Sequence, residues 1–441
     1  WICFLREWFL MESYNLVSFG GIFILLAVAW IFSRNRKNLN FRLILWGLAL
    51  QMAFAGFIFI VPAGAKAFLL VNDAVVRVLE AASSGISFVF GKLAIPAGKE
   101  GSLGFILAFQ ALPAVIVFSA LVSMLYYLGV MQLLIRLFAR LFTSLMRISG
   151  AESLCAASNI FVGVESAIAV RPHLAKMTSS ELCTILTVGM ATVASNVLAL
   201  YVFTLQDIFP TIAGHLISAS FLSAPAALIM SKVLYPEDGE PVTLGKKIDP
   251  FYEKDNNLFE SIINGANAGV KVAIGIAALL MAVLGLVALA DLLIGGVGSW
   301  INDLCGLTVD WSIKGILGYL FYPVAVVIGI PLPDAGEAGR IIGERLVLTE
   351  VASYQHLAES IRQGVLTEPR SAVIIAYALC GFAHVASVAI FVGGVAALAP
   401  ERTRDLTRVS MRALAAATFA CLLTACVAGT FYSHEIILFG K

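Results

Sequence analysis

Residues 262–293 read IINGANAGVKVAIGIAALLMAVLGLVALADLL, and this stretch decides the fold class. Lys271 and Asp291 are its charged residues, and no proline interrupts it. A helix that crosses a bilayer needs about 20 mostly apolar residues. The stretch is long enough, so it predicts a membrane-spanning helix and an integral membrane protein.

The composition of the whole chain supports this prediction. Of its 441 residues, 60% are hydrophobic and 13% are charged, whereas soluble domains carry roughly 25% charged residues. The net charge of +1 gives no sign of a nucleic-acid surface, so we expect no nucleic-acid partner. The 7 cysteines form no C-x-x-C pair or Cys/His cluster, which argues against a disulfide framework or a metal centre.

Eight apolar runs are long enough to span a bilayer, and four further apolar stretches are interrupted by glycine, proline or charge. The predicted spans are residues 15–33, 41–62, 104–130, 182–208, 211–234, 262–293, 370–397 and 408–433. The interrupted stretches are 66–95, 150–180, 311–330 and 332–365. Re-entrant hairpins or interfacial helices fit 150–180 and 332–365, because each is too long for a loop and too broken for a clean span.

The chain begins ten residues before its first methionine. We expect residues 1–10 to be an added segment or the product of an upstream start, with Met11 the natural beginning. No secretory signal is evident, because the run from Leu16 to Phe32 lacks a small-residue cleavage site and precedes a basic loop. We interpret this run as a true membrane helix.

Basic residues set the predicted orientation. They cluster after the first, third, fifth and seventh spans, and placing all four clusters in the cytoplasm satisfies the positive-inside rule. Both chain ends are then expected outside. Arginines at helical spacing among Leu and Phe predict that 131–148 lies along the inner membrane surface. The clusters are Arg34, Arg36, Lys37 and Arg42; Arg136, Arg140 and Arg147; Lys246, Lys247 and Lys254; and Arg402, Arg404 and Arg408.

The order of elements repeats along the chain. Residues 131–234 run from an interfacial helix through a broken hairpin to two spans, and residues 312–433 follow the same order. The first hairpin would enter the membrane from inside and the second from outside. Inverted repeats with discontinuous helices are the common plan of secondary transporters. The predicted fold is therefore an all-α membrane protein with about eight transmembrane helices, two re-entrant hairpins in inverted repeats, and interfacial helices.

The first hairpin region carries polar groups that a bilayer penalises. It reads SNIFVGVES at residues 158–166 and ends at Arg171-Pro172. A carboxylate in a membrane helix costs about 2.5–3.5 kcal/mol on the lenient insertion scale, so Glu165 needs a partner or a function. A structural ion pair between Glu165 and Arg171 is one reading. Binding of a ligand is the other.

A polar group follows in the next span. Thr192, Ser195 and Asn196 have helical spacing, which is typical of helix–helix packing in membranes. Alternatively, Asn159 and Thr192 supply side-chain oxygens to a cation, together with carbonyl groups of an unwound segment.

The second hairpin region opens with PLPDAGEAGR at residues 331–340, and we expect Asp334, Glu337 and Arg340 to form a solvated turn. Glu350 is harder to place in water, because its flanks Leu348 and Val351 are apolar. Carboxylates accept hydrogen bonds from sugar hydroxyls, so such a group suits a polyhydroxylated solute such as a ribose.

Residues 377–387 read YALCGFAHVAS inside an apolar span. Gly381 is expected to break or kink the helix and leave backbone groups for a ligand or a neighbour. His384 lies beside this break and one helical turn from Ser387, and a structural and a functional role are equally open. Phe382 could pack on an apolar ring face.

Several segments resemble concentrative nucleoside transporters, in the order in which they occur in that family. They are KEGSLGFILAFQALP (99–113), SALVSMLYYLGVMQ (119–132), GANAGVK (265–271), LTE (348–350) and ALCGFA (378–383). The likeness covers roughly residues 100–430.

The resemblance implies a homotrimer that imports nucleosides, driven by sodium or protons, through elevator-type alternating access. It also implies a scaffold and a moving transport domain in each protomer. The expected division is 1–14 as an N-terminal extension, 15–130 as scaffold, 131–234 as the first transport repeat, 235–311 as a cytoplasmic loop and scaffold helix, 312–433 as the second transport repeat, and 434–441 as a tail.

The resemblance also implies roles for individual residues. The substrate-binding residues would be Glu165 of the first hairpin, Val197 against the base, Glu350 on the ribose, Phe382, His384 and Ser387. A sodium ion would be bound by the side chains of Asn159 and Thr192 and by backbone oxygens near Val162 and Val193. No other cofactor is expected.

Two departures from the family pattern bear on specificity. The family usually reads G-Q-T-E or G-Q-S-E at the first hairpin, whereas Gly163-Val164-Glu165 is one residue shorter and lacks the glutamine that reads the base. His384 stands where the family has a ribose-binding asparagine. Base recognition and the coupling ion are therefore open, and Glu165, Glu350 and His384 could titrate in a proton cycle.

We accordingly expect a nucleoside symporter of the bacterial inner membrane. One alternative is the same mechanism for a modified nucleoside or another polyhydroxylated solute. A membrane-embedded enzyme is a remote alternative, since the chain shows no nucleophile elbow, zinc motif or phosphate loop. A passive channel is disfavoured, because the polar residues gather in two hairpin regions and do not line a continuous stripe.

Overall fold

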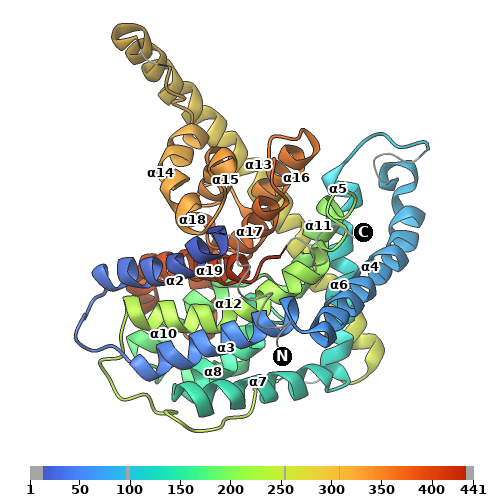
Figure 1. Ribbon diagram of the computed structural model, residues 1–441. Coiled ribbons are helices and arrows are strands. Elements are labelled where there is room, and N and C mark those ends of the chain that lie inside the picture. Colours follow the sequence, from blue (N-terminus) through green and yellow to red (C-terminus); the bar gives the residue numbers. More distant parts are fainter. Residues whose placement is uncertain (1–12, 96–99, 253–254, 307, 434–441) are drawn as a thin grey trace.

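The computed structural model describes residues 13–95, 100–252, 255–306 and 308–433, without the side chains of 164 and 165, and this part is helical (Figure 1). The predictions for residues 1–10 and 434–441 therefore lie outside the described residues. The first half contains α2 (Ser13–Ile31), α3 (Phe41–Phe59), α4 (Pro62–Phe90), α5 (Leu107–Gln110), α6 (Leu112–Tyr127), α7 (Val130–Met146), α8 (Gly150–Asn159), η2 (Val164–Val170), α9 (Arg171–Leu174), α10 (Ser179–Ala191), α11 (Ser195–Leu205) and α12 (Ile212–Leu234). The second half contains α13 (Leu258–Cys305), α14 (Ile313–Val327), α15 (Leu332–Glu344), α16 (Glu350–Arg362), α17 (Pro369–Leu379), α18 (Val385–Leu398) and α19 (Thr403–Thr430).

Eight helical segments of the described chain are long and apolar enough to span a membrane. The predicted all-α membrane fold is thereby confirmed, but three segments differ from their predictions. Residues 66–95 were expected to be interrupted, yet Pro62–Phe90 is one continuous helix. Its charged residues, Lys66, Asp73, Arg77 and Glu80, all lie on the exposed side, so they do not break it.

The other two differences concern residues 182–208 and 370–397, each of which was counted as one span. Residues 182–205 lie in two helices, α10 and α11, separated by residues 192–194. Residues 370–397 form two shorter helices, α17 and α18, separated by residues 380–384. The break falls at the predicted position, because Gly381 has a φ of +158° that other residues rarely adopt. The helix that decided the fold class is longer than predicted. With 48 residues, α13 measures about 72 Å, well beyond the roughly 30 Å of a hydrocarbon core.

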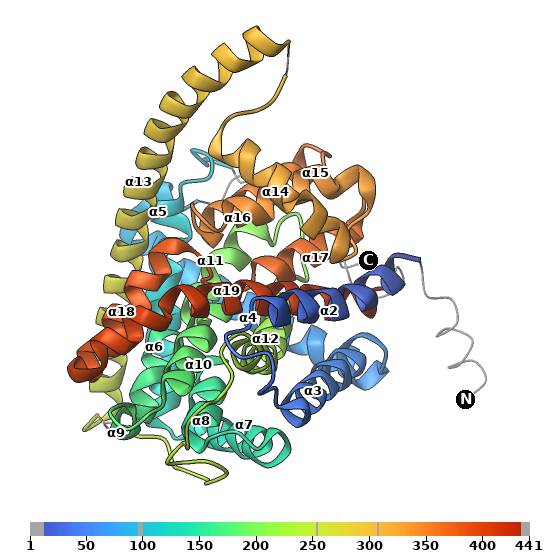
Figure 2. The ribbon, with the colours of Figure 1, turned by 90° about the vertical axis from the view of Figure 1, so that its left-hand side faces the viewer.

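The helices form a buried bundle with more exposed helices around it. Of the apolar 18-residue segment of α12, 89% is buried inside the protein, whereas the corresponding segments of α13 and α4 are each 17% buried. Figures 1 and 2 show α7 at one end of the molecule, the group α14–α16 at the other, and α13 running past both. The core is formed by α10, α12, α17 and α19, which pack against one another.

The predicted repetition of elements is found in the structure. A single helix, a helical hairpin, a discontinuous helix pair and a long helix follow one another as α7, α8–α9, α10–α11 and α12. The same order recurs as α14, α15–α16, α17–α18 and α19. Each repeat thus contains one helix pair that is interrupted within an apolar segment.

The four basic clusters lie at one end of the molecule, apart from Lys254, which is outside the described residues. Arg34 is 3.6 Å from Asp238, which follows α12, and Arg42 donates to the carbonyl of Leu145 at the end of α7. Arg402 donates to the carbonyl of Met177, just before α10. Arg140 and Lys247 line one small pocket. Basic clusters at one end are what a single cytoplasmic face requires under the positive-inside rule. That this end faces the cytoplasm stays a prediction.

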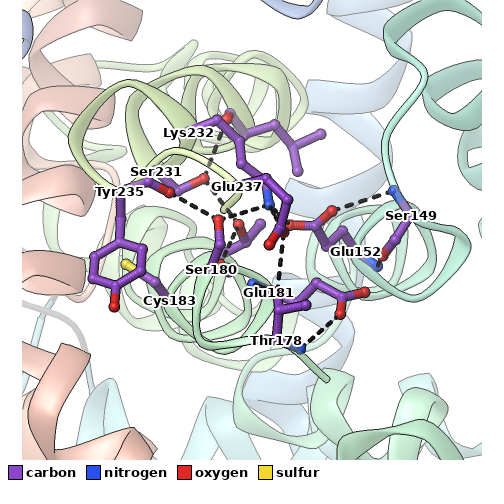
Figure 3. A network of polar contacts seen from close by, with 12 residues as sticks. Ser149, Glu152, Thr178, Ser180, Glu181, Cys183, Ser231, Lys232, Tyr235 and Glu237 are labelled. Atoms are coloured by element: carbon purple, nitrogen blue, oxygen red, sulfur yellow. Dashed lines mark hydrogen bonds and ion pairs between the residues drawn. The ribbon is translucent and has the colours of Figure 1, made fainter. Parts of the chain in front are cut away.

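A buried ion network joins three helices at this basic end (Figure 3). Nζ of Lys232 on α12 lies 2.6 Å from Oε1 of Glu152 on α8 and 3.0 Å from Oε2 of Glu237. It also donates to Oγ of Ser180 on α10 at 2.9 Å. Glu152 and Glu181 complete capping boxes that begin α8 and α10. The network therefore fixes the starts of two helices relative to the end of a third.

We predict that Lys232→Ala destabilises the protein severely, by about 3–5 kcal/mol, because it leaves buried carboxylates without their cation. Thermal unfolding of the detergent-solubilised protein measures this as a large drop in melting temperature. Arg404→Ala is the matched control, since Arg404 is an exposed cation at the same end. Equal melting temperatures for the two variants would contradict the prediction.

Candidate functional site

A cavity of about 530 Å³ lies where the interrupted helices approach α13. It is lined by residues from the starts of α11, α16 and α18 and from the middle of α13. Five of the six residues predicted to bind substrate line it: Val197, Glu350, Phe382, His384 and Ser387. The structure thus brings together side chains that are almost 200 positions apart in sequence, and the cavity is the candidate substrate site.

Glu165, the sixth predicted residue, belongs to η2. Its side chain lies outside the described part of the structure, and so does the alternative of an ion pair between Glu165 and Arg171. Its neighbour Gly163 lines the cavity. A Cβ on Gly163 would come within 3.0 Å of Cβ of Ala194, so the turn of the first hairpin packs on the break between α10 and α11.

Helix starts position the polar side chains. Thr349 caps α16 by accepting a hydrogen bond from the amide of Ala352, which places Glu350 in the first helical turn. His384 caps α18, and its Nδ1 accepts a hydrogen bond from the amide of Ser387 at 3.2 Å. Helix N-termini carry partial positive charge, so both favour electron-rich groups in the cavity.

Glu350 is buried and is held from two sides. The hydroxyl of Tyr201 donates to Oε1 at 2.7 Å. Nε2 of His384 lies 3.1 Å from Oε2. Because Nδ1 of His384 accepts a hydrogen bond, the ring proton is on Nε2 and faces the carboxylate. His384 is the one described residue within hydrogen-bonding distance of Oε2. A carboxylate oxygen accepts two hydrogen bonds, so a second position on Oε2 is left for a hydroxyl donor on a ligand.

The remaining walls of the cavity are mostly apolar. Val197, Phe382 and Phe391 contribute one side, and Ile276 and Leu280 of α13 contribute another. Polar groups on one side and apolar walls elsewhere suit a ligand with clustered hydroxyls and a flat, weakly polar ring.

A second group of oxygens surrounds the break between α10 and α11. Asn159 ends α8, Thr192 ends α10, and both are buried. Nδ2 of Asn159 donates to Oγ1 of Thr192 and to the carbonyl of Val188, and Oγ1 of Thr192 lies 3.2 Å from the carbonyl of Asn159. Oδ1 of Asn159 has no partner among the described residues. Amide, hydroxyl and carbonyl oxygens at helix C-termini suit a hard cation such as sodium.

Val162 and Val193, the predicted backbone ligands, flank the contact between Gly163 and Ala194. They therefore lie beside the Asn159–Thr192 pair, and the structure brings the four predicted ion-site residues into one region.

Comparison with known proteins identifies the family. The family described as "Na+ dependent nucleoside transporter C-terminus" matches residues 215–429, its N-terminal counterpart matches 20–93, and "Nucleoside recognition" matches 108–207. The chain belongs to the concentrative nucleoside transporter family. Its named relatives are transporters, so the chain is a membrane transporter and the alternative of an embedded enzyme is excluded.

Relatives match over almost the whole chain. An "Uncharacterized transporter" of Haemophilus influenzae is 39% identical, covering 94% of this chain and 97% of the relative. "Nucleoside permease NupC" of Helicobacter pylori is 35% identical, covering 95% and 98%. A solved structure of CNTnw "in an inward-facing substrate-bound state" superposes with a TM-score of 0.85 at 34% identity, covering 95% and 98%. An outward-facing structure of a CNTnw variant gives a TM-score of 0.84.

In the second hairpin, the prediction of a solvated turn is wrong for Asp334. Asp334 was expected in a solvated turn but is fully buried. Its carboxylate accepts hydrogen bonds from the amides of Thr367 and Glu368 and from Oγ of Ser371, and so holds the start of α17. Arg340, in contrast, is exposed at 45% and lies 3.6 Å from Asp310, as a solvated residue would.

Glu337 also departs from the solvated turn, because it joins the two arms of this hairpin. His356 on α16 lies 3.0 Å from Glu337 and 2.9 Å from Glu344, both on α15. Burial disfavours the imidazolium, but the hydrogen bonds and charges of the two glutamates outweigh it and raise the pKa of His356 from 6.5 to about 9. The hydrogen bond from His356 lowers the pKa of Glu337 from 4.5 to about 2. Both helices lie outside the candidate spans.

Sequence reasoning missed several residues of the cavity. Asn196 lines it and was noted only as one of three small polar residues. Tyr201 holds Glu350 but lies in an apolar span, where only its hydroxyl distinguishes it. Val272, Ile276 and Leu280 of α13 have ordinary helical spacing, which does not separate a cavity wall from a lipid-facing surface.

We predict that His356→Gln destabilises the protein at pH 6 and that this effect disappears as the pH rises through about 9. A raised pKa contributes stability that is fully present below the unfolded value of 6.5 and is lost above the folded value. Melting temperatures of wild type and variant across this pH range measure the difference. His173→Gln is the control on another surface. A difference in melting temperature that stays constant up to pH 10 would exclude a protonated His356 that joins Glu337 and Glu344.

Proposed function

We propose that this protein imports nucleosides across the bacterial inner membrane, together with sodium, by moving its substrate cavity between the two sides. The observation that supports this most directly is the buried carboxylate of Glu350, which lines the cavity and whose Oε2 faces only His384 among the described residues. A ribose hydroxyl would supply a second donor to this oxygen. The alternative coupling ion is the proton, carried by the group of Glu165, Glu350 and His384.

The two ends of a nucleoside would contact different walls. Glu350 would bind the ribose hydroxyls together with Ser387, which lies in the first turn of α18. Val197 and Phe382 would pack on the faces of the base. His384 would hold Glu350 in position and cap α18 at the same time.

Sodium would be bound at Asn159 and Thr192, with backbone oxygens near Val162 and Val193. Because α11 starts three residues after Thr192 and carries both Val197 and Tyr201, an ion at the break would order the helix that contacts the substrate. One monovalent cation crossing 100 mV contributes about 2.3 kcal/mol. That is roughly 50-fold accumulation of a neutral solute before any concentration gradient of the ion.

The division into scaffold and transport domains follows from the same mechanism. The packing of α6 against α13 supports a fixed pair, and the cavity lies between α13 and the interrupted helices. Because α2 packs on α19 and α3 on α12, we assign residues 13–59 to the moving part, which differs from the expected scaffold of 15–130. The homotrimer is supported by the family resemblance, and the exposed apolar residues of α13, such as Met281, Leu286 and Leu292, would face lipid or another protomer.

We predict that uptake of labelled uridine and adenosine into proteoliposomes requires a sodium gradient. Thr192→Val removes one oxygen of the ion site and is expected to raise the sodium concentration for half-maximal uptake about tenfold or more. Thr187→Val is the matched control, because Thr187 is a buried threonine on the same helix that bonds the carbonyl of Cys183. Uptake driven by a proton gradient alone would contradict sodium coupling and indicate the carboxylate–histidine group.

We predict that Glu350→Gln abolishes uptake while the protein remains folded, because an amide cannot accept from the Tyr201 hydroxyl, the His384 proton and a ribose at once. Size-exclusion chromatography and uptake measure the two properties. His384→Asn, which restores the family residue, is expected to keep activity and shift substrate preference. Normal affinity in Glu350→Gln would remove this carboxylate from the site.

A modified nucleoside or another polyhydroxylated solute is the second candidate. It is favoured by the short first hairpin at Gly163-Val164-Glu165 and by His384, which uses both ring nitrogens within the protein. Competition of labelled uridine uptake by a panel of solutes separates the two. Saturation by ordinary nucleosides at micromolar concentration would exclude the second candidate.

A further inference from the structure

A second cavity, of about 320 Å³, lies toward the basic end of the molecule. It is lined by the end of α6, by α7, by the end of α8, by the start of α13 and by the chain just before it. Asn196 lines both this cavity and the candidate substrate site, so the two share a wall. A solute that leaves the substrate site toward the basic end meets this cavity next.

Aromatic rings form part of its lining. The rings of Tyr126 and Tyr252 are stacked, with centroids 5.7 Å apart and planes inclined by 22°. Phe161 and Phe251 contribute two further rings. Flat aromatic surfaces bind nucleobases by stacking, and they do so with little regard to the identity of the base.

Two side-chain amides provide hydrogen-bond acceptors in this second cavity. Nε2 of Gln132 donates to the carbonyl of Tyr126 at 2.8 Å, and Nδ2 of Asn196 donates to Oγ of Ser119 at 3.2 Å. Both amide nitrogens are therefore engaged. Oε1 of Gln132 and Oδ1 of Asn196 are buried and accept no hydrogen bond within the described part of the chain. Buried oxygens normally accept a hydrogen bond, so these two favour a ligand that carries N–H or O–H donors.

The described residues that line this cavity include one carboxylate, Asp255, and no cation. Oδ1 of Asp255 accepts a hydrogen bond from Asn264 at 2.8 Å. Stacking surfaces and neutral acceptors without a cation suit an uncharged nitrogen heterocycle better than a phosphate.

We propose that this cavity is a second nucleoside subsite, on the release side of the substrate site, that binds the base. The base stacks on the aromatic lining, and its N–H groups donate to Gln132 and Asn196. Asn196 contacts the ligand from either cavity, so the base is transferred without losing this acceptor. The inference rests on the proposed nucleoside transport.

Photolabelling of the full-length protein in nanodiscs with 8-azidoadenosine, followed by mass spectrometry of the adducts, tests it. We expect adducts in two regions, around Phe382–Phe391 and around Tyr126 and Tyr252. Glu350→Gln removes the first set and leaves the second. Tyr252→Ala lowers labelling of the second set about tenfold, as expected for one lost stacking contact, and leaves the first set unchanged.

Two further variants and a competitor test the amide contacts. Gln132→Leu is expected to weaken labelling of the second set up to about tenfold, whereas Gln363→Leu, an exposed amide on another surface, leaves it unchanged. Uridine is expected to protect the second set about tenfold better than 3-methyluridine, which lacks the N3–H donor. Equal protection by the two nucleosides would overturn the role of the amides.

The remaining outcomes separate the two proposals. Adducts around Phe382–Phe391 alone would overturn the second subsite and leave nucleoside transport standing. No displaceable adduct in either region of the wild-type protein would refute nucleoside binding, and the subsite with it.

Discussion

The contact between Gly381 and Ala191 is the constraint on which the rest of the structure depends. A Cβ on Gly381 would come within 2.9 Å of the backbone of Ala191, so the two interrupted helix pairs can cross this closely only with glycine at that position. Sγ of Cys421 on α19 lies 3.7 Å from the carbonyl of Ala191 and 3.4 Å from that of Cys380, and thus contacts both breaks. An apolar environment offers no water to these freed carbonyls, so the protein itself must satisfy them.

Where the two interrupted helix pairs cross, helix N-termini and helix C-termini lie at different places. The starts of α16 and α18 line the substrate cavity, where their partial positive charge suits carboxylate and hydroxyl oxygens. The ends of α8 and α10 meet at Asn159 and Thr192, where partial negative charge suits a cation. The end of α17 is covered by a protein cation, because the buried guanidinium of Arg345 donates to the carbonyl of Ala378. The candidate substrate site and the proposed ion site therefore share the break between α10 and α11, with opposite ends of helices in each.

Much of this follows from the sequence, and the exceptions have physical reasons. Gly381 predicts a break, and apolar flanks single out Glu350, because both signals are local. The contact between Glu350 and His384 joins residues 34 positions apart, and only the folded chain brings them together. Asp334 was predicted to lie in a solvated turn with Glu337 and Arg340, yet distant donors at Thr367 and Ser371 allow its burial. The charges of α4 resemble interruptions in sequence, but in three dimensions they share an exposed side.

Coupling between ion and substrate needs a physical connection, and α11 provides one. Its first turn begins beside Thr192, and its second turn carries Tyr201, whose hydroxyl donates to Glu350 at 2.7 Å. An ion that fixes the break fixes the direction of α11, and with it the donor that orients the carboxylate. Linkage is reciprocal, so in the proposed mechanism a substrate that holds Glu350 would strengthen ion binding by the same factor. Because α11 begins at the break and is hydrogen-bonded to Glu350 through Tyr201, it connects the proposed ion site with the proposed substrate site.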